Sequence, residues 1–154
     1  MTDLEKFREW IKTFPGFDIL SEFQCDFTDQ ALPGSAGLFP SGLVEVERRS
    51  DVMGNVTVTN QYNFGLYCVF SKPKGDDSAA SINADWVMDF QRWVQEQSVR
   101  GLAPTFGDVP REERMLAQNG VLYDVDKEGT VGIYMVQMSA TYKLIFEVKN
   151  EWLN

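Results

Sequence analysis

Histidine is absent from this 154-residue chain, and cysteine occurs only twice. Without histidine there is no common general base, no Ser-His or Cys-His nucleophile system, and no ligand of the type that binds metals most often. Cys25 and Cys68 are far apart and neither belongs to a C-x-x-C pair, which excludes a zinc ribbon and a thioredoxin motif. We interpret Cys68 as a small core residue and expect no disulfide, because a reducing compartment keeps thiols free.

Long apolar runs are missing as well. None approaches the roughly 20 residues that a bilayer-spanning helix requires. The first ten residues, MTDLEKFREW, carry charges of both signs and no apolar signal-peptide segment. The sequence therefore predicts a cytoplasmic protein with no membrane partner.

Positive charge is scarce, since the chain has 14 Lys and Arg but 23 Asp and Glu, which gives a net charge of −9. A general nucleic-acid binder needs a surplus of cations to contact phosphates, so no specific nucleic-acid binding is expected. The acidity either keeps the protein soluble or gives it a surface that must not adhere to DNA.

Glycine-rich phosphate and nucleophile motifs are also lacking. The stretch Gly34-Ser35-Ala36-Gly37 has no following lysine and is therefore not a P-loop, and it is not G-x-S-x-G. No dinucleotide-binding fingerprint appears elsewhere. We interpret the stretch as a surface loop that can contact a partner.

Carboxylates are plentiful, but their spacing indicates no reactive centre. The pairs Asp76/Asp77 and Asp124/Asp126 lie in segments rich in turn residues, where solvation accounts for them. Asp124-x-Asp126-x-Glu128-Gly129 imitates the opening of a Ca²⁺ loop, but its twelfth position is Met135 and its flanks are predicted strands. We therefore predict a turn, no catalytic, cofactor-binding or metal-binding residues, no cofactor and no enzymatic activity.

What the chain has in abundance is apolar alternation with a period of two, which predicts half-buried β-strands. It runs from Asn55 to Ser71 and again from Thr130 to Lys149. The apolar positions are Val56, Val58, Tyr62, Phe64, Leu66, Cys68 and Phe70, interrupted by Asn60, and then Tyr134, Val136, Met138, Ala140, Tyr142, Leu144, Phe146 and Val148. Each strand would span roughly 50 Å at about 3.3 Å per residue, so part of it should project as an arm or curl strongly.

Two amphipathic helices are predicted to cover one face of this sheet. The first spans 3–14, begins with a Thr2/Glu5 capping box and stops at Pro15-Gly16. The second spans 82–98, is capped by Ser81 or Asn83 and ends near Gly101. Their apolar stripes are Leu4, Phe7, Trp10, Ile11 and Phe14, and Trp86, Val87, Phe90, Trp93 and Val94.

The connecting segments have weaker patterns. Before the first long strand we predict a short strand starting at 17–20, a Gly/Pro-rich loop over 32–42 and a short strand at 43–48. After the second helix we predict a loop over 102–109, then a short helix from Pro110 that buries Met115 and Leu116 and ends at Gly120. A strand over 121–125 and a hairpin turn over 126–129 follow, and the tail 150–154 is expected to fray, although Trp152 could dock.

Together these elements predict one α+β domain over residues 1–154. It consists of an antiparallel β-sheet with long strands and two main α-helices packed on one face.

Two loose motifs carry a resemblance to a known family. The first is Phe90-x-x-Trp93-x-x-x-Gln97-x-x-x-Gly101-x-x-Pro104, and the second is Tyr123-Asp124 followed by Tyr134-x-x-Gln137-x-x-x-x-Tyr142. With Phe39-Pro40-Ser41-Gly42 before an acidic strand, this order resembles the small minor capsid proteins of tailed phages and Gram-positive prophages. Those proteins are similar to tail-terminator and head–tail joining proteins. The resemblance extends over most of the chain.

The resemblance implies a structural virion protein without catalytic residues. Such proteins assemble as homo-oligomeric rings, commonly hexamers, where the tail tube meets the head, beside other tail or connector proteins. The chain would be in the host cytoplasm before assembly and in the virion afterwards. An acidic ring would let DNA pass without binding it, and exposed strand edges would pair with a neighbouring subunit.

Two alternatives stay open. A small-ligand or peptide-binding module would use a pocket between the 82–98 helix and the sheet, lined by Trp86, Trp93 and Tyr142. An enzyme that uses a carboxylate pair ranks last.

Overall fold

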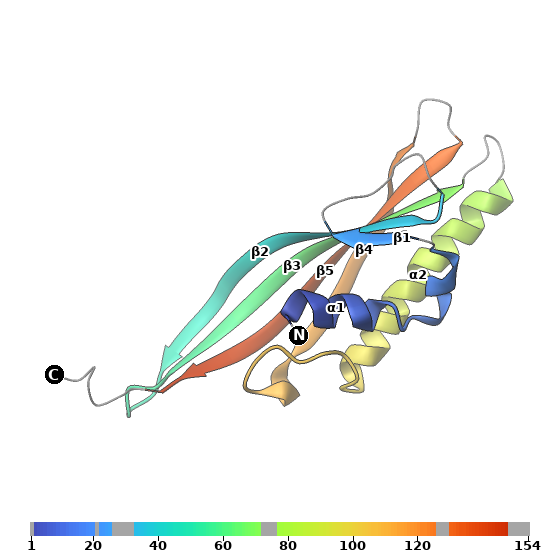
Figure 1. Ribbon diagram of the computed structural model, residues 1–154. Coiled ribbons are helices and arrows are strands. Elements are labelled where there is room, and N and C mark those ends of the chain that lie inside the picture. The colour runs from blue at the N-terminus through green and yellow to red at the C-terminus, as the bar shows by residue number, and fades with distance from the viewer. Residues whose placement is uncertain (1, 21, 26–32, 72–76, 126–129, 148–154) are drawn as a thin grey trace.

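A five-stranded sheet organises the computed structural model, which describes residues 2–20, 22–25, 33–71, 77–125 and 130–147. Its strand order is β1-β2-β3-β5-β4. β1 (Glu22–Cys25) is parallel to β2, and all other neighbours are antiparallel. Helices α1 and α2 lie on one face (Figure 1). The fold is α+β, with the antiparallel sheet, long strands and one-sided helices that the sequence predicts.

The centre of the sheet is the pair β3 (Val56–Ser71) and β5 (Val131–Phe146). They pair in unbroken register from Val56 opposite Phe146 to Ser71 opposite Val131, so both predicted long strands are confirmed. The even-numbered side chains face the helices and supply most of the buried residues of both strands. Asn60, the polar exception in this pattern, is buried opposite Tyr142, and the two side chains are hydrogen-bonded. The register thus gives the buried amide a partner.

A third long strand, β2 (Ser35–Ser50), pairs with β3 and corrects the prediction for this region. The described residues of the predicted 32–42 loop are strand from Ser35 onward, and the predicted 43–48 strand is only the end of β2. The register shifts between Pro40 and Gly42, where Gly42 has a φ of +93°. A β-bulge therefore accommodates the proline and glycine whose composition suggests a loop.

Two short predicted elements are also wrong. Residues 17–20, predicted to begin a strand, fall largely in the 3₁₀ helix η1 (Pro15–Ile19). Pro110 opens only the 3₁₀ turn η2 (Pro110–Glu112), and the predicted helix beyond it is the strand β4 (Arg114–Val125). The loop over 102–109 is confirmed, and the predicted turn over 126–129 lies outside the described residues.

Gly120 lies inside β4 rather than at the end of a helix. A glycine is needed there because α2 passes too close for a larger residue. A Cβ there would lie 2.2 Å from Val87 and 2.5 Å from the Gln91 amide. That amide accepts from the Gly120 N–H and donates to the Ala117 carbonyl, at 3.1 and 3.0 Å. Gln91 therefore satisfies the backbone where the register shifts between Gln118 and Val121.

Helices α1 (Asp3–Ile11) and α2 (Asp77–Val99) confirm both predicted helices with shifted ends. The Thr2/Glu5 capping box is present, but α1 ends at Ile11 rather than at residue 14. α2 begins at Asp77, so Ser81 and Asn83 are not its caps. The Asn83 side chain instead donates to the Ser71 carbonyl at 3.0 Å and ties the helix to the end of β3.

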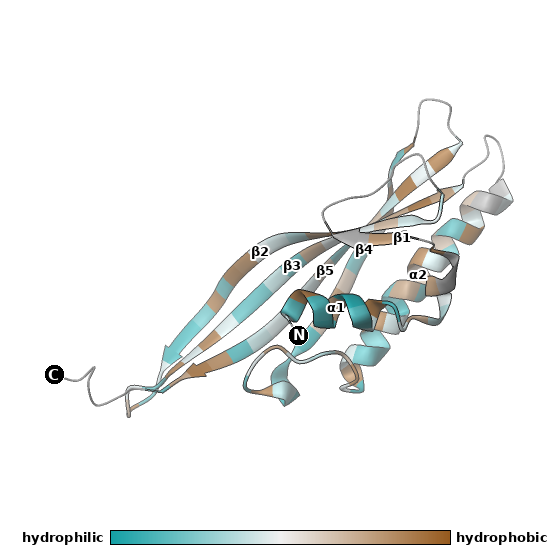
Figure 2. Ribbon diagram, in the orientation of Figure 1, coloured by the Kyte–Doolittle hydropathy of each residue, from teal (hydrophilic) through white to brown (hydrophobic). Residues whose placement is uncertain are grey.

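The core lies between these helices and the even face of β3 and β5. The Phe7 ring stacks on Phe64 with centroids 4.0 Å apart, and Trp10 stacks on Trp93 at 4.9 Å. Phe90 is completely buried beside Phe14, Trp86 and Trp93. Hydrophobic residues also continue along the long strands beyond the helices (Figure 2). The core face of the sheet is therefore longer than the layer that covers it.

Candidate assembly surfaces

The long strands extend beyond the rest of the sheet as an arm, defined here as residues 43–60 and 142–146. β1 pairs with β2 only as far as Leu38, and β4 pairs with β5 only as far as Thr141. Past these points β2, β3 and β5 run on without further strands beside them, away from both helices (Figure 1). Every residue of β2 from Ser41 to Ser50 is exposed. This is the projection that the length of the strands predicts.

The arm is unusually apolar for an exposed structure. Among the described residues, 15 large hydrophobic side chains are exposed, and seven of them belong to the arm: Leu43, Val44, Val46, Val52, Met53, Ile145 and Phe146. Val52 is fully exposed at the hairpin tip, and Met53 beside it is 75% exposed. Monomeric proteins rarely keep apolar side chains gathered in water, which marks the arm as a candidate interaction surface.

The two faces of the arm differ in chemistry. On the helix-side face, Val56 lies opposite Phe146 and Val58 opposite Leu144. On the other face β3 presents Thr57 and Thr59, β5 presents Lys143 and the exposed Ile145, and β2 presents the exposed Val44. The helix-side face therefore continues the core as far as Val58, which is buried, while Phe146 and Leu43 are exposed on the same face as Glu45 and Arg48.

One edge of the arm is occupied by the protein itself. The Asp108 N–H donates to the Lys143 carbonyl, and the Asp108 carboxylate accepts from the Ile145 N–H, each at 2.8 Å. Lys143 also forms an ion pair with Glu112 at 2.8 Å. The loop that leads to β4 thus satisfies the β5 edge, as a further strand would.

The opposite edge, along β2, has no neighbouring strand after Leu38 among the described residues. It carries register shifts at Pro40/Gly42 and Glu45/Glu47, and two ion pairs, Glu45–Arg48 and Glu47–Arg49. Bulges and edge charges hinder indiscriminate strand pairing. This edge is therefore open, but only to a partner that matches its irregular outline.

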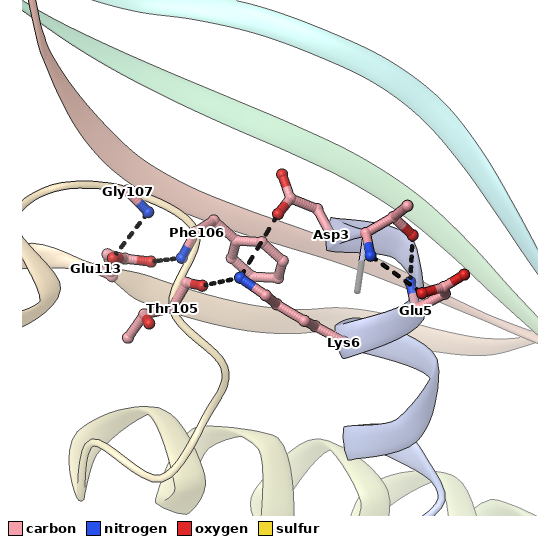
Figure 3. Close-up of polar contacts among 8 residues, drawn as sticks. Asp3, Glu5, Lys6, Thr105, Phe106, Gly107 and Glu113 are labelled. Atoms are coloured by element: carbon pink, nitrogen blue, oxygen red, sulfur yellow. Dashed lines mark hydrogen bonds and ion pairs between the residues drawn. The ribbon is translucent and has the colours of Figure 1, made fainter.

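Glu113 holds the loop against the body of the protein. Its carboxylate accepts from the backbone N–H groups of Phe106 and Gly107, at 2.6 and 3.2 Å (Figure 3). Lys6 of α1 reaches the Thr105 carbonyl at 3.4 Å from the other side. A carboxylate that accepts two backbone N–H groups fixes the loop more firmly than a neutral side chain would.

Replacing Gly107 by alanine is expected to lift this loop from β5. An added Cβ would lie 2.3 Å from the Lys143 carbonyl oxygen, a backbone atom that cannot move aside without disturbing the strand. We expect the free energy of unfolding to fall by about 1–3 kcal/mol, measured by urea denaturation, with faster amide exchange at Ile145. Thr105→Ala in the same loop is the matched control, since only its carbonyl is used. Equal stability of the Gly107→Ala and Thr105→Ala variants would contradict the close approach of Gly107 to the Lys143 carbonyl.

A hollow of about 400 Å³ opens between this loop, the end of α2 and strands β4 and β5. Met115 and Ala140 form part of its lining and are buried, with Ala103 and Phe106 beside them. Its remaining lining residues are Ser98, Val99, Arg100, Gly101, Pro104, Thr105, Pro110, Arg111, Glu113, Arg114 and Thr141. An apolar lining with several guanidinium groups suits an apolar side chain next to a carboxylate.

A second hollow, of about 340 Å³, lies between α2 and β4. Ala80 and Ala84 of the helix leave this space because their side chains are small, and Gly120 lines it from the strand. Leu122 and Tyr134 complete its strand side. The lining is mostly apolar, and the Gln91 amide in it already bonds to the backbone of β4.

The three residues predicted to line a ligand pocket line neither hollow. Trp86 packs edge-on against Phe14 and donates its indole N–H to the Gly16 carbonyl at 2.8 Å. Trp93 stacks on Trp10. Tyr142 lies beside Phe106, and burial raises the pKa of its phenol. These rings are packing residues.

The carboxylates considered for chemistry are not brought together. Asp124 is exposed on β4 and accepts from the Val125 N–H, while Met135 pairs with Val121 in the middle of the sheet. The side chain of Asp77 and the whole of residues 76, 126, 128 and 129 lie outside what the structure describes. Within the described ranges no group of three or more His, Cys, Asp or Glu is placed to hold a metal ion.

The predicted surface loop at Gly34–Gly37 is wrong from Ser35 onward. Ser35 is buried at the start of β2, and only Gly34, with a φ of +89°, lies in the preceding turn. Cys68 is a free, buried thiol, as predicted, and burial raises its pKa, so the reactive thiolate is disfavoured. The side chain of Cys25, on β1, lies outside the described part of the chain.

The motif residues that carry the family resemblance have structural roles here. The Gln97 amide accepts from the Trp10 indole N–H at 3.1 Å, joining α2 to α1. Gly101 has a φ of +70° where α2 ends, and the following N–H donates to the Gln97 carbonyl at 2.9 Å. A left-handed residue at this position favours glycine. The spacing of the motif thus encodes helix packing and a helix end rather than chemistry.

Comparison with known proteins finds no family model that matches the chain and no matching curated protein. In the part of the chain that the structure describes, none of the helices is both long enough and apolar enough to cross a bilayer.

Proposed function

We propose that this protein is a structural subunit that self-associates into a homo-oligomeric ring. Following the resemblance of its sequence, we assign the ring to the head–tail junction of a tailed phage or prophage, next to other tail or connector proteins. The observation that carries the proposal is the arm, whose seven exposed hydrophobic side chains have no cover within the chain's described part.

The two edges of the sheet support a head-to-tail arrangement. The β5 edge of the arm is occupied by the loop through Asp108, whereas the β2 edge is open. A chain whose two sides differ associates through two different surfaces, and such contacts close into rings when the rotation between subunits permits. The net charge of −9 supports a ring around DNA, since like charge keeps the lumen from binding phosphates.

A small-ligand or peptide-binding module is the second candidate. The hollow of about 340 Å³ between α2 and β4 favours it, because this is the space between the second helix and the sheet. A pocket that recognises a ligand needs a few convergent polar groups. The Gln91 amide is already engaged by Ala117 and Gly120, which leaves the ring as the better supported proposal.

Light scattering and sedimentation of the purified chain over a wide concentration range test the proposal. We expect the mass to rise from that of the 154-residue monomer to a closed oligomer, with ring-shaped particles by negative-stain electron microscopy. Interfaces of stable oligomers bury well over roughly 1,000 Å². A monomer at millimolar concentration, also in the presence of tail and connector proteins, would refute the ring.

A further inference from the structure

The arm ends in a well-ordered hairpin tip, residues 51–55. The Asp51 carboxylate accepts from the N–H groups of Met53 and Asn55, at 2.8 and 2.9 Å. The Asp51 N–H in turn donates to the Asn55 carbonyl at 2.9 Å. Hydrogen bonds thus fix the turn in which Val52 is fully exposed and Met53 is three-quarters exposed. A fixed turn that presents two apolar side chains beside a carboxylate has little conformational freedom to lose on binding.

The hollow of about 400 Å³ has the complementary character. Met115, Ala103 and Ala140 give it apolar walls, and Arg111 and Arg114 line it as well. Of the ten Lys and Arg in the described part of the chain, six form ion pairs there: Lys6, Lys12, Arg48, Arg49, Arg100 and Lys143. Two of the other four are Arg111 and Arg114, so the hollow has two arginines outside these ion pairs and one carboxylate, Glu113, which already accepts from two backbone N–H groups.

Tip and hollow of one chain cannot meet. The β5 residues that line the hollow, Ala140 and Thr141, pair with Tyr62 and Gln61 of β3. The tip begins beyond the pairing of Val56 with Phe146, five residues further along β5. At about 3.3 Å per residue this places the tip roughly 16 Å past the hollow, on a strand that continues away from it.

We propose that the hairpin tip of one copy docks into the hollow of the next copy, with Val52 and Met53 against the apolar lining and Asp51 facing Arg111 and Arg114. This inference rests on the proposed self-association and names the surfaces that perform it. The two surfaces are different, so each chain offers one tip and one hollow, and the contact propagates around a ring. The charge of the tip favours this fit, because Asp51 is the only charged residue among residues 51–55.

Two double variants test the docking. The tip variant carries Val52→Lys and Met53→Lys, and the hollow variant carries Arg111→Glu and Arg114→Glu. All four side chains are exposed, so folding should be preserved, and circular dichroism checks this. We expect each variant alone to raise the dissociation constant of the assembly by at least about 100-fold, because lysine meets arginine in one and Asp51 meets glutamate in the other. Ile82→Lys and Arg92→Glu on α2 are the matched controls and should assemble like the wild-type chain.

Mixing the two variants gives the sharper test. The tip variant keeps a sound hollow and the hollow variant keeps a sound tip, so in a one-to-one mixture the unlike chains should dock through this intact pair. The remaining lysine tip and glutamate hollow attract each other, so the mixture should recover part of the assembly that neither variant shows alone. The chain that carries all four substitutions should recover part of its assembly, because lysine then faces glutamate.

The outcomes separate this inference from the proposed function. Wild-type assembly that neither variant disturbs overturns the docking and leaves the ring proposal intact. A hollow variant that assembles normally beside a defective tip variant would show that tips contact tips, which also overturns it. A wild-type chain that stays monomeric overturns both.

Discussion

Replacing Phe90 by alanine is expected to lower the free energy of unfolding by about 3–5 kcal/mol, the usual cost of deleting a buried aromatic side chain. Phe90 is completely buried, and its ring lies 5.3 Å from Phe14, 5.8 Å from Trp86 and 6.0 Å from Trp93. The cavity would open where α1 and α2 meet the sheet. Such a loss is a large fraction of the roughly 5–15 kcal/mol that stabilises a domain.

Urea denaturation followed by tryptophan fluorescence measures this change, because Trp86 and Trp93 flank the deleted ring. Asp89→Ala, at the exposed neighbouring position of the same helix, is the control and should shift stability by no more than about 0.5 kcal/mol. A loss below about 1 kcal/mol for Phe90→Ala would mean that the helices are not packed on the sheet as the ring contacts describe.

The central strands and both helices could be predicted because burial on one face leaves a regular period. Val58 to Phe70 recur every second residue, and Phe7, Trp10 and Ile11 recur at helical spacing. The first part of β2 escaped prediction, although its end was predicted as the strand at 43–48. Its edge position tolerates Pro40 and its bulge needs Gly42, so local composition indicates a loop while pairing with β3 makes a strand. Tertiary pairing overrode the local signal there.

The candidate surfaces were only half predictable. The arm follows from strand length alone, since strands much longer than a domain must project. The hollow does not follow, because it is assembled from Arg111 and Arg114 on one segment, Ala140 on another and the end of α2 on a third. No periodicity links these positions. Only the structure shows that Arg111 and Arg114 lie at one hollow and take part in none of the ion pairs among the described residues.

The second large effect is expected on assembly. A variant with Leu43→Lys, Val46→Lys and Phe146→Lys places three charges on the arm, at side chains that are 57%, 55% and 49% exposed in the single chain. Exposed substitutions change folding stability little, so the monomer should keep its fold. If an interface buries these side chains, each substitution removes about 1 kcal/mol or more of favourable apolar contact and places a desolvated charge in the interface.

Three such losses amount to at least about 3–4 kcal/mol, which raises the dissociation constant by a factor of roughly 100 to 1,000. Sedimentation equilibrium should therefore show a monomer at concentrations where the wild-type chain is a ring. Ile82→Lys is the control, since Ile82 is 67% exposed but lies on α2, away from the arm. The single variant Leu43→Lys adds the same charge at a similarly exposed position, so a difference between it and Ile82→Lys reports the location of the interface rather than surface charge in general. Assembly that survives the arm substitutions, or that Ile82→Lys disrupts equally, would remove the arm from the interface.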